Sequence, residues 1–121
     1  MLERWRVAVA DDSTAVVLAQ DGDAMLGLAC VRAEWLDGLY VVPWHWGSGV
    51  AQVLLDHALG LVACFGSQRC HLWVLEHNRR ARRFYERLGW RENGDTRVVP
   101  FPPNPIDVGY TIDLDSRMAA E

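Results

Sequence analysis

Two glycines directly before an apolar helical pattern are the feature of this sequence with the clearest chemical meaning. Gly47 and Gly49 follow an apolar stretch that ends at Val42, and the helical pattern begins at Val50. The first amides of a helix have no carbonyl partner within the helix, and the positive end of the helix dipole lies beside them. A strand that runs through a glycine turn into a helix therefore predicts an anion site of the phosphate-binding kind. A tight turn without a ligand is the alternative interpretation.

The elements that must position this turn begin with short apolar runs. Leu2–Val9 predicts one short helix. Thr14–Ala19 and Met25–Val31 predict two antiparallel strands, because the Asp21-Gly22 step between them is a hairpin signal. Trp35–Val42 predicts a third strand of the same meander, with Trp35, Asp37, Leu39 and Val41 on one face and Leu36, Gly38, Tyr40 and Val42 on the other.

The part of the chain after the glycines predicts helices and strands in turn. Apolar residues at helical spacing predict a helix from Gly49 to about Phe65, and Cys70–Leu75 has the length and apolar density of a buried strand. Strand, helix and strand in this order are typical of a βαβ unit, in which Cys70–Leu75 would run parallel to the strand that ends at Val42. Asn78 as N-cap and Gly89 as the residue after the C-cap frame a second helix. Strands are predicted at Glu92–Val99 and Asp107–Leu114, with a stiff loop between them that contains Pro100, Pro102, Pro103 and Pro105.

Composition limits the class of protein. With 121 residues, half of them hydrophobic, the chain fits a single domain over residues 1–121. The formal charge of -4 disfavours a general nucleic-acid binder. No apolar run reaches the ~18 residues of a membrane span, so we expect no membrane association and a cytoplasmic location. Cys30, Cys64 and Cys70 lack metal-site spacing, which predicts reduced, buried thiols and no metal.

The sequence resembles the acetyl-CoA-binding core of the GNAT superfamily of N-acetyltransferases. The resemblance covers roughly residues 39–90 and rests on two motifs in this order and separation. The first is Val41-Val42-Pro43 followed by Trp46-Gly47-Ser48-Gly49-Val50-Ala51, and the second is Leu72-Trp73-Val74-Leu75 with Asn78, Ala81, Phe84-Tyr85 and Leu88-Gly89-Trp90. In the family pattern Q/R-x-x-G-x-G/A, Trp46 stands where Gln or Arg is usual, while Gly49 and Ala51 match.

The resemblance implies an α/β fold with a mixed sheet, an antiparallel meander followed by the βαβ unit, that splays open between the strands at residues 35–42 and 70–75. Acetyl-CoA would lie in that gap, with its pantetheine amides bonded to backbone groups near Val41 and Val42 and its pyrophosphate on residues 47–51. Trp46 would remove one polar contact to the phosphates without affecting the backbone cradle.

The resemblance also implies direct attack of a substrate amine on the thioester. Tyr85 would protonate the leaving thiolate as general acid, and Asn78 would bond to the cofactor or act only as an N-cap. A core aromatic is the alternative role for Tyr85. The candidate bases are Glu34, which we place first, Asp37, Glu76 and His77, each with the alternative of a solvated strand-end residue or of deprotonation through water.

Two further features bear on function. Arg79, Arg80, Arg82 and Arg83 predict a solvated helix face, with Arg79 or Arg80 within reach of a cofactor phosphate as the alternative.

The chain is short at its front and would lack the family's usual first strand and first helix. This favours pairing of an exposed sheet edge with a second copy of the chain, which would form a homodimer. Two functions follow: an N-acetyltransferase acting on an amine, or a non-catalytic acyl-CoA-binding or dimerisation module.

Overall fold

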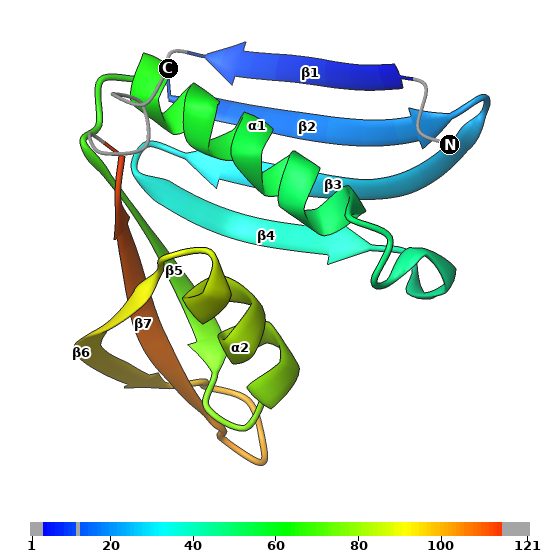
Figure 1. The fold of residues 1–121 in the computed structure, drawn as a ribbon. Coiled ribbons are helices and arrows are strands. Elements are labelled where there is room, and N and C mark those ends of the chain that lie inside the picture. Colours follow the sequence, from blue (N-terminus) through cyan, green and yellow to red (C-terminus); the bar gives the residue numbers. More distant parts are fainter. Residues whose placement is uncertain (1–3, 12, 115–121) are drawn as a thin grey trace. The chain divides into compact units, whose positions relative to one another are not determined.

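The computed structural model describes residues 4–11 and 13–114 of the chain. They form a mixed α/β protein with seven strands, two α-helices and one short 3₁₀ helix (Figure 1). The chain divides into two compact units, Met1–Gln68 and Arg69–Glu121, and each is described by itself. The predicted parallel pairing and the splayed gap concern both units together and stay predictions, as does the single-domain organisation.

The first unit is an antiparallel meander with a helix on one face (Figure 1). Its strands are β1 (Arg4–Asp11), β2 (Thr14–Asp21), β3 (Ala24–Arg32) and β4 (Trp35–Val41), followed by the 3₁₀ helix η1 (Pro43–His45) and helix α1 (Val50–Cys64). Gly22 lies in the β2–β3 turn with a left-handed φ of 59°, which confirms the hairpin and the reason for glycine there. The three predicted strands and the predicted helix are therefore confirmed.

The helix predicted for Leu2–Val9 is wrong. Residues Arg4–Asp11 form β1, which pairs with β2 in a register that sets Val7 opposite Val17 and Val9 opposite Ala15. The apolar residues at positions 7 and 9 fit a two-residue period as well as a helical one, and pairing with β2 satisfies the backbone in a way that a short isolated helix could not. A strand thus precedes the hairpin, so the expectation that the chain lacks a first strand is also wrong; Leu2 lies outside the described residues.

A β-bulge in β4 changes which side chains of that strand are buried. Cys30 pairs with Gly38 and Val31 with Leu36, so Asp37 is an extra residue opposite the β3 ladder. The predicted strict alternation therefore breaks at this point, because a bulge shifts the side chains that follow it to the other face. Leu36 and Val41 are both buried although they were predicted on opposite faces.

Small residues on the sheet let α1 pack closely. Helix α1 contacts β2, β3 and β4. At Gly27 a Cβ atom would lie 2.9 Å from Leu54 Cδ1 of α1 and 2.5 Å from the carbonyl oxygen of Tyr40 on β4. The core of this unit consists mainly of side chains that are buried on these elements: Ala15, Val17, Ala19, Leu26, Ala29, Val31, Leu36, Val41, Val50, Leu54, Leu55, Ala58, Leu59 and Val62.

The second unit is a three-stranded antiparallel sheet with one helix. It contains β5 (Arg69–Leu75), α2 (Arg79–Arg87), β6 (Arg91–Val98) and β7 (Ile106–Asp113), and β7 pairs with both β5 and β6. These elements confirm the predicted ones to within about two residues. The Asn78 side chain caps α2, and Gly89 after it has a φ of 99°, as predicted.

None of the three cysteines, all of which lie in the described residues, forms a disulfide, and only Cys70 is buried. Cys64 is exposed at the end of α1 and Cys30 is partly exposed, which corrects the expectation of three buried thiols. Among the residues described, no group of three or more His, Cys, Asp and Glu side chains is placed to hold a metal ion. None of the described helices is long and apolar enough to cross a membrane.

The contact at Gly27 predicts a destabilising substitution. We expect Gly27→Ala to lower the free energy of unfolding by about 1–3 kcal/mol, because the added methyl group meets backbone that cannot move aside easily. The control is Gly60→Ala within α1, where a Cβ atom meets nothing within 4 Å. It should raise stability by about 0.5–1 kcal/mol, since alanine is the better helix former. Urea unfolding measures both, and equal effects of the two variants would contradict the close packing.

Candidate functional site

The loop from β4 to α1 is ordered by its own hydrogen bonds. The His45 amide donates to the Val42 carbonyl at 2.9 Å and the Trp46 amide to the Pro43 carbonyl at 3.1 Å. The carbonyl of His45 accepts from both the amide and the hydroxyl of Ser48, at 3.2 Å and 2.6 Å. The chain thus turns tightly from the strand towards the helix within the loop itself.

Gly47 and Gly49 give the loop its direction into α1. Their φ angles are 82° and 92°, in the left-handed region that other residues adopt only with strain. A Cβ atom at either glycine would meet nothing within 4 Å, so backbone conformation and not space requires glycine there.

The start of α1 has the features of an anion site. The first backbone hydrogen bond of the helix runs from the Val53 amide to the Gly49 carbonyl, so the amides of Val50, Ala51 and Gln52 have no carbonyl within the helix to donate to. Gly49 supplies no capping side chain, and the first turn contains no acidic residue. The amides and the positive end of the helix dipole are therefore suited to hold a negatively charged group.

The backbone groups of Val41 and Val42 differ in how they are used. The Val42 amide donates to the Leu26 carbonyl at 2.8 Å, and its carbonyl accepts from His45. Because backbone groups alternate along a strand, those of Val41 point away from β3. The Val41 carbonyl accepts a hydrogen bond from Trp46 Nε1 at 2.7 Å. Of these two residues, Val41 is thus the one whose backbone faces away from the meander.

Asn78 and Tyr85 both lie where the sequence predicted them, on the N-cap and the inner face of α2. The Asn78 side-chain oxygen accepts from the Ala81 amide at 3.2 Å, which is the N-cap role. Tyr85 is 9% exposed and its ring packs edge-on against Phe84 and Trp90. Burial, and to a lesser degree the nearby Cys70, raises the pKa of Tyr85 to about 12. The hydroxyl therefore keeps its proton throughout the neutral range.

The candidate bases lie on different elements. Glu34 is exposed in the β3–β4 turn, at the opposite end of β4 from the glycine loop. Asp37 in the bulge forms an ion pair with Arg32 at 2.9 Å. Glu76 and His77 lie together after β5, with 3.9 Å between Glu76 Oε1 and His77 Nε2. Within the first unit the candidates thus lie in the β3–β4 turn and the adjacent bulge, and within the second unit they lie directly after β5.

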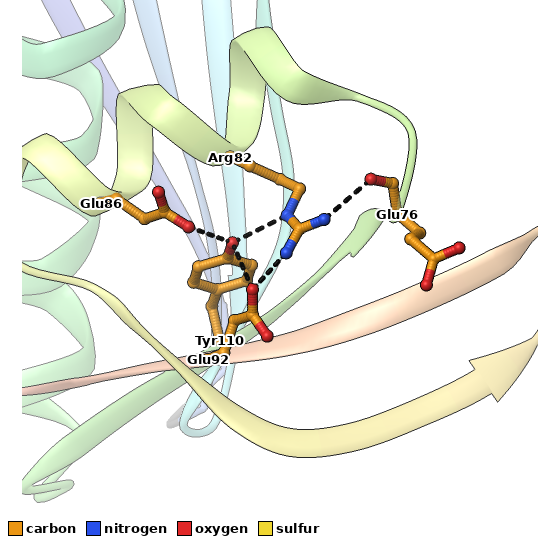
Figure 2. Close-up of polar contacts among 5 residues, drawn as sticks. All are labelled: Glu76, Arg82, Glu86, Glu92 and Tyr110. Carbon is orange, nitrogen blue, oxygen red and sulfur yellow. Dashed lines mark hydrogen bonds and ion pairs between the residues drawn. The ribbon is translucent and has the colours of Figure 1, made fainter.

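Arg82 is the centre of a polar cluster that the sequence did not predict (Figure 2). Its Nε donates to the Tyr110 hydroxyl and its Nη1 to the Glu76 carbonyl, both at 2.9 Å, while Nη2 pairs with Glu92. The Tyr110 hydroxyl donates to Glu86 Oε2 at 2.6 Å. The prediction that Arg82 belongs to a solvated face is therefore wrong. Its side-chain partners lie 10 and 28 residues away on β6 and β7, and no spacing within α2 could indicate them.

The cluster holds the helix that carries Tyr85 against two strands. Arg82 and Glu86 come from α2, Glu92 from β6 and Tyr110 from β7, where Glu92 and Tyr110 are register partners. Burial raises the pKa of Tyr110, the Glu86 carboxylate adds to the rise, and the Arg82 guanidinium opposes it. The hydrogen bond with Tyr110 is the main cause that raises the pKa of Arg82. The guanidinium is therefore charged, and its planar fork fixes the orientation of α2.

The second unit also contains a cavity of about 370 Å³ at the end of α2. Its lining combines two arginines with two carboxylates and contains none of the residues predicted for the site: Arg69, Leu88, Gly89, Arg91, Glu92, Asn93, Thr111, Ile112 and Asp113. Glu92 is the residue that this cavity shares with the Arg82 cluster. Arg79, Arg80 and Arg83 are exposed, as predicted.

Comparison with known proteins adds the family context. The model of the acetyltransferase (GNAT) family matches residues 2–90. Over 96 residues the chain is 31% identical to an uncharacterized N-acetyltransferase of Mycobacterium tuberculosis, which covers 75% of this chain and 62% of that protein. Over 90 residues it is 29% identical to the peptidyl-lysine N-acetyltransferase YjaB of Salmonella typhimurium, covering 71% of this chain and 59% of that protein. The chain thus spans about 60% of the length of these relatives.

A solved structure supports the same fold. A protein of Bacillus anthracis described as a streptothricin acetyltransferase, in complex with acetyl coenzyme A, has a TM-score of 0.77. It is 13% identical, and the match covers 86% of this chain and 65% of that chain. At this identity the similarity is one of fold, and it confirms the predicted fold class.

The Arg82 cluster predicts that the Tyr110 hydroxyl stabilises the second unit. Tyr110→Phe removes the group that bridges Arg82 and Glu86, and we expect the free energy of unfolding to fall by about 1–3 kcal/mol. The control is Tyr40→Phe on β4, where the side chain is 48% exposed and the change should be within about 0.5 kcal/mol. Chemical denaturation measures both, and a neutral Tyr110→Phe would show that the cluster adds nothing to stability.

Proposed function

Because this chain belongs to the acetyltransferase (GNAT) family, we propose that it transfers an acetyl group from acetyl-CoA to a primary amine of a small molecule or a protein. The observation that carries the proposal is the start of α1, where amides without helical partners follow two left-handed glycines. A helix start of this kind suits a pyrophosphate, because several amides converge on one anion without a side chain in the way. The residues present therefore fit the cofactor.

The cofactor-binding residues in this proposal come from one continuous segment. The backbone of Gly47, Ser48, Gly49, Val50 and Ala51 holds the pyrophosphate. The pantetheine arm would accept a hydrogen bond from the outward N–H of Val41, because the Val41 carbonyl is already bonded to Trp46. Val42 and Trp46 support this arrangement indirectly, since their polar groups bond to Leu26, His45 and Val41 within the unit. Asn78 begins the helix that carries Tyr85.

Acetyl-CoA supplies an activated acetyl thioester. Attack by the amine forms the C–N bond and breaks the C–S bond, so the amine loses a proton and the thiolate gains one. We propose that Tyr85 is the general acid at the thiolate. Since its pKa is about 12 and that of a thiol about 8.5, the hydroxyl is protonated at neutral pH, donates to the sulfur as the C–S bond breaks, and regains from solvent the proton that it transfers. Glu34 is the base in this proposal, acting directly or through water.

The proposed acceptor of the acetyl group is a primary amine. YjaB is named for peptidyl-lysine, so a lysine side chain in a peptide is the first acceptor to test.

A cytoplasmic location and pairing of two copies through the edge strand β1 are also proposals. The latter follows from the outer edge of β1 in the first unit, whose backbone groups are not used by β2.

A non-catalytic acyl-CoA-binding or dimerisation module is the second candidate. One observation favours it: the indole of Trp46 bonds to Val41 and offers no polar group to the phosphates. The acetyltransferase and the acyl-CoA-binding module both bind CoA, a dimerisation module does not require it, and only the acetyltransferase depends on Tyr85.

Cofactor binding predicts a shift in thermal unfolding. At a concentration of acetyl-CoA a hundred times its Kd, we expect the folded protein to gain about 2.7 kcal/mol, because only the folded state has the site. Pantetheine, which lacks the pyrophosphate, should give little shift. Gly49→Ala should abolish the shift, whereas Gly22→Ala, which strains another left-handed glycine, should keep it. No shift in the natural protein would refute the acetyltransferase and the acyl-CoA-binding module and would leave the dimerisation module.

The proposed role of Tyr85 predicts a loss of turnover without a loss of binding. We expect Tyr85→Phe to lower kcat by about 10²-fold with an unchanged Kd for acetyl-CoA, because only the proton donor is removed. The control Tyr40→Phe should leave kcat unchanged. Since the pKa of Tyr85 is raised, the protonated form persists, and the kcat of the natural enzyme should not fall between pH 7 and about pH 10 through this group. Unchanged kcat in Tyr85→Phe would remove it from the mechanism.

A further inference from the structure

Trp46, which follows η1 in the middle of the β4–α1 loop, ties the loop back to the strand that precedes it. Its indole Nε1 donates to the Val41 carbonyl at 2.7 Å, five positions earlier in the chain. The bond encloses η1, whose own hydrogen bonds run over shorter separations. Among the hydrogen bonds described in this loop, it is the one that joins the glycine segment directly to β4.

This bond acts on a segment that is otherwise costly to order. The two glycines that follow Trp46 lose more conformational entropy on ordering than other residues do. The start of α1 at Val50 takes its position from them, and so do the first amides of the helix. A hydrogen bond immediately before the glycines therefore reduces the number of conformations that the loop must give up when an anion binds.

The remaining surface of Trp46 offers no second polar group. An indole has a single donor and no acceptor, and here the donor is used by Val41. The side chain is 55% exposed, so its contribution to anion binding must come through the conformation of the loop. Direct contact with a phosphate would require the Val41 bond to break.

We propose that Trp46 is a positioning residue that holds the β4–α1 loop in its anion-binding conformation before the cofactor arrives. This inference rests on the proposed function, since it concerns the same pyrophosphate site. By ordering the loop, Trp46 compensates for the polar contact with the phosphates that its own side chain cannot make. The amides of α1 meet a pyrophosphate in an arrangement that is already formed.

The test compares Trp46→Phe with Trp44→Phe. Phenylalanine keeps an aromatic ring at position 46 and removes the N–H donor. Trp44 lies in η1 and is 78% exposed, which makes it a matched control in the same loop. Calorimetry with CoA should show a Kd that rises about tenfold in Trp46→Phe and stays unchanged in Trp44→Phe. The KM for acetyl-CoA should rise with it, while kcat and the KM for the acceptor stay unchanged, a split that general destabilisation would not produce.

A second measurement reports on the loop without any ligand. In the unliganded protein, the indole N–H of Trp46 should exchange with solvent slowly by NMR, and this signal should be absent in Trp46→Phe. If Trp46→Phe fails to fold, benzothienylalanine at position 46 keeps the bicyclic ring and lacks the donor, and the same rise in Kd is expected.

The outcomes separate this inference from the proposed function. Natural protein that does not bind CoA refutes the proposed function and this inference with it. Natural protein that binds CoA, with an equal Kd in Trp46→Phe, overturns the role of Trp46 alone. Tighter binding by Trp46→Phe also overturns it, and would show that the indole competes with the cofactor for the Val41 carbonyl. Rapid exchange of the indole in the unliganded protein contradicts the preformed loop.

Discussion

The left-handed backbone at Gly47 and Gly49 is the constraint on which the first unit depends. It redirects the chain from β4 into α1, so the helix starts with unpaired amides and then lies over the sheet. The same helix can approach β3 only because Gly27 lacks a side chain. Glycines therefore serve two distinct purposes in this unit. One pair sets backbone direction, and Gly27 provides space for close packing.

In the second unit, long-range polar contacts set the position of the residue that we propose as the general acid. Tyr85 lies between Arg82 and Glu86 in sequence, and both of these side chains bond to the Tyr110 hydroxyl. The helix is anchored on the strands by one face while the tyrosine packs in the core beside Trp90. The position of a catalytic side chain is set by the neighbouring residues that hold it in one rotamer.

The sequence predicted most of the fold because local signals and tertiary structure agree there. Asn78 and Gly89 mark the ends of α2, and Asp21-Gly22 marks the first hairpin. It failed at β1, where a short apolar pattern fits two periods and only pairing with β2 decides between them. It also missed the bulge at Asp37, since register is a property of two strands. At the site, the glycine loop was predictable from the position of its glycines between a strand and a helix. The hydrogen bonds of Trp46 and Arg82 depend on three-dimensional geometry that residue spacing does not encode.

The Arg82 cluster has a consequence for how sequences of this kind diverge. A guanidinium that bonds at once to a hydroxyl, a carboxylate and a backbone carbonyl cannot be exchanged for lysine without leaving a partner unsatisfied. Loss of Tyr110 or Glu92 would likewise leave a charge without its usual neighbour. The side chains at positions 82, 92 and 110 therefore form one interdependent set. A change at one of them is tolerated best when the other two change with it, so covariation at these positions would trace the cluster through related proteins.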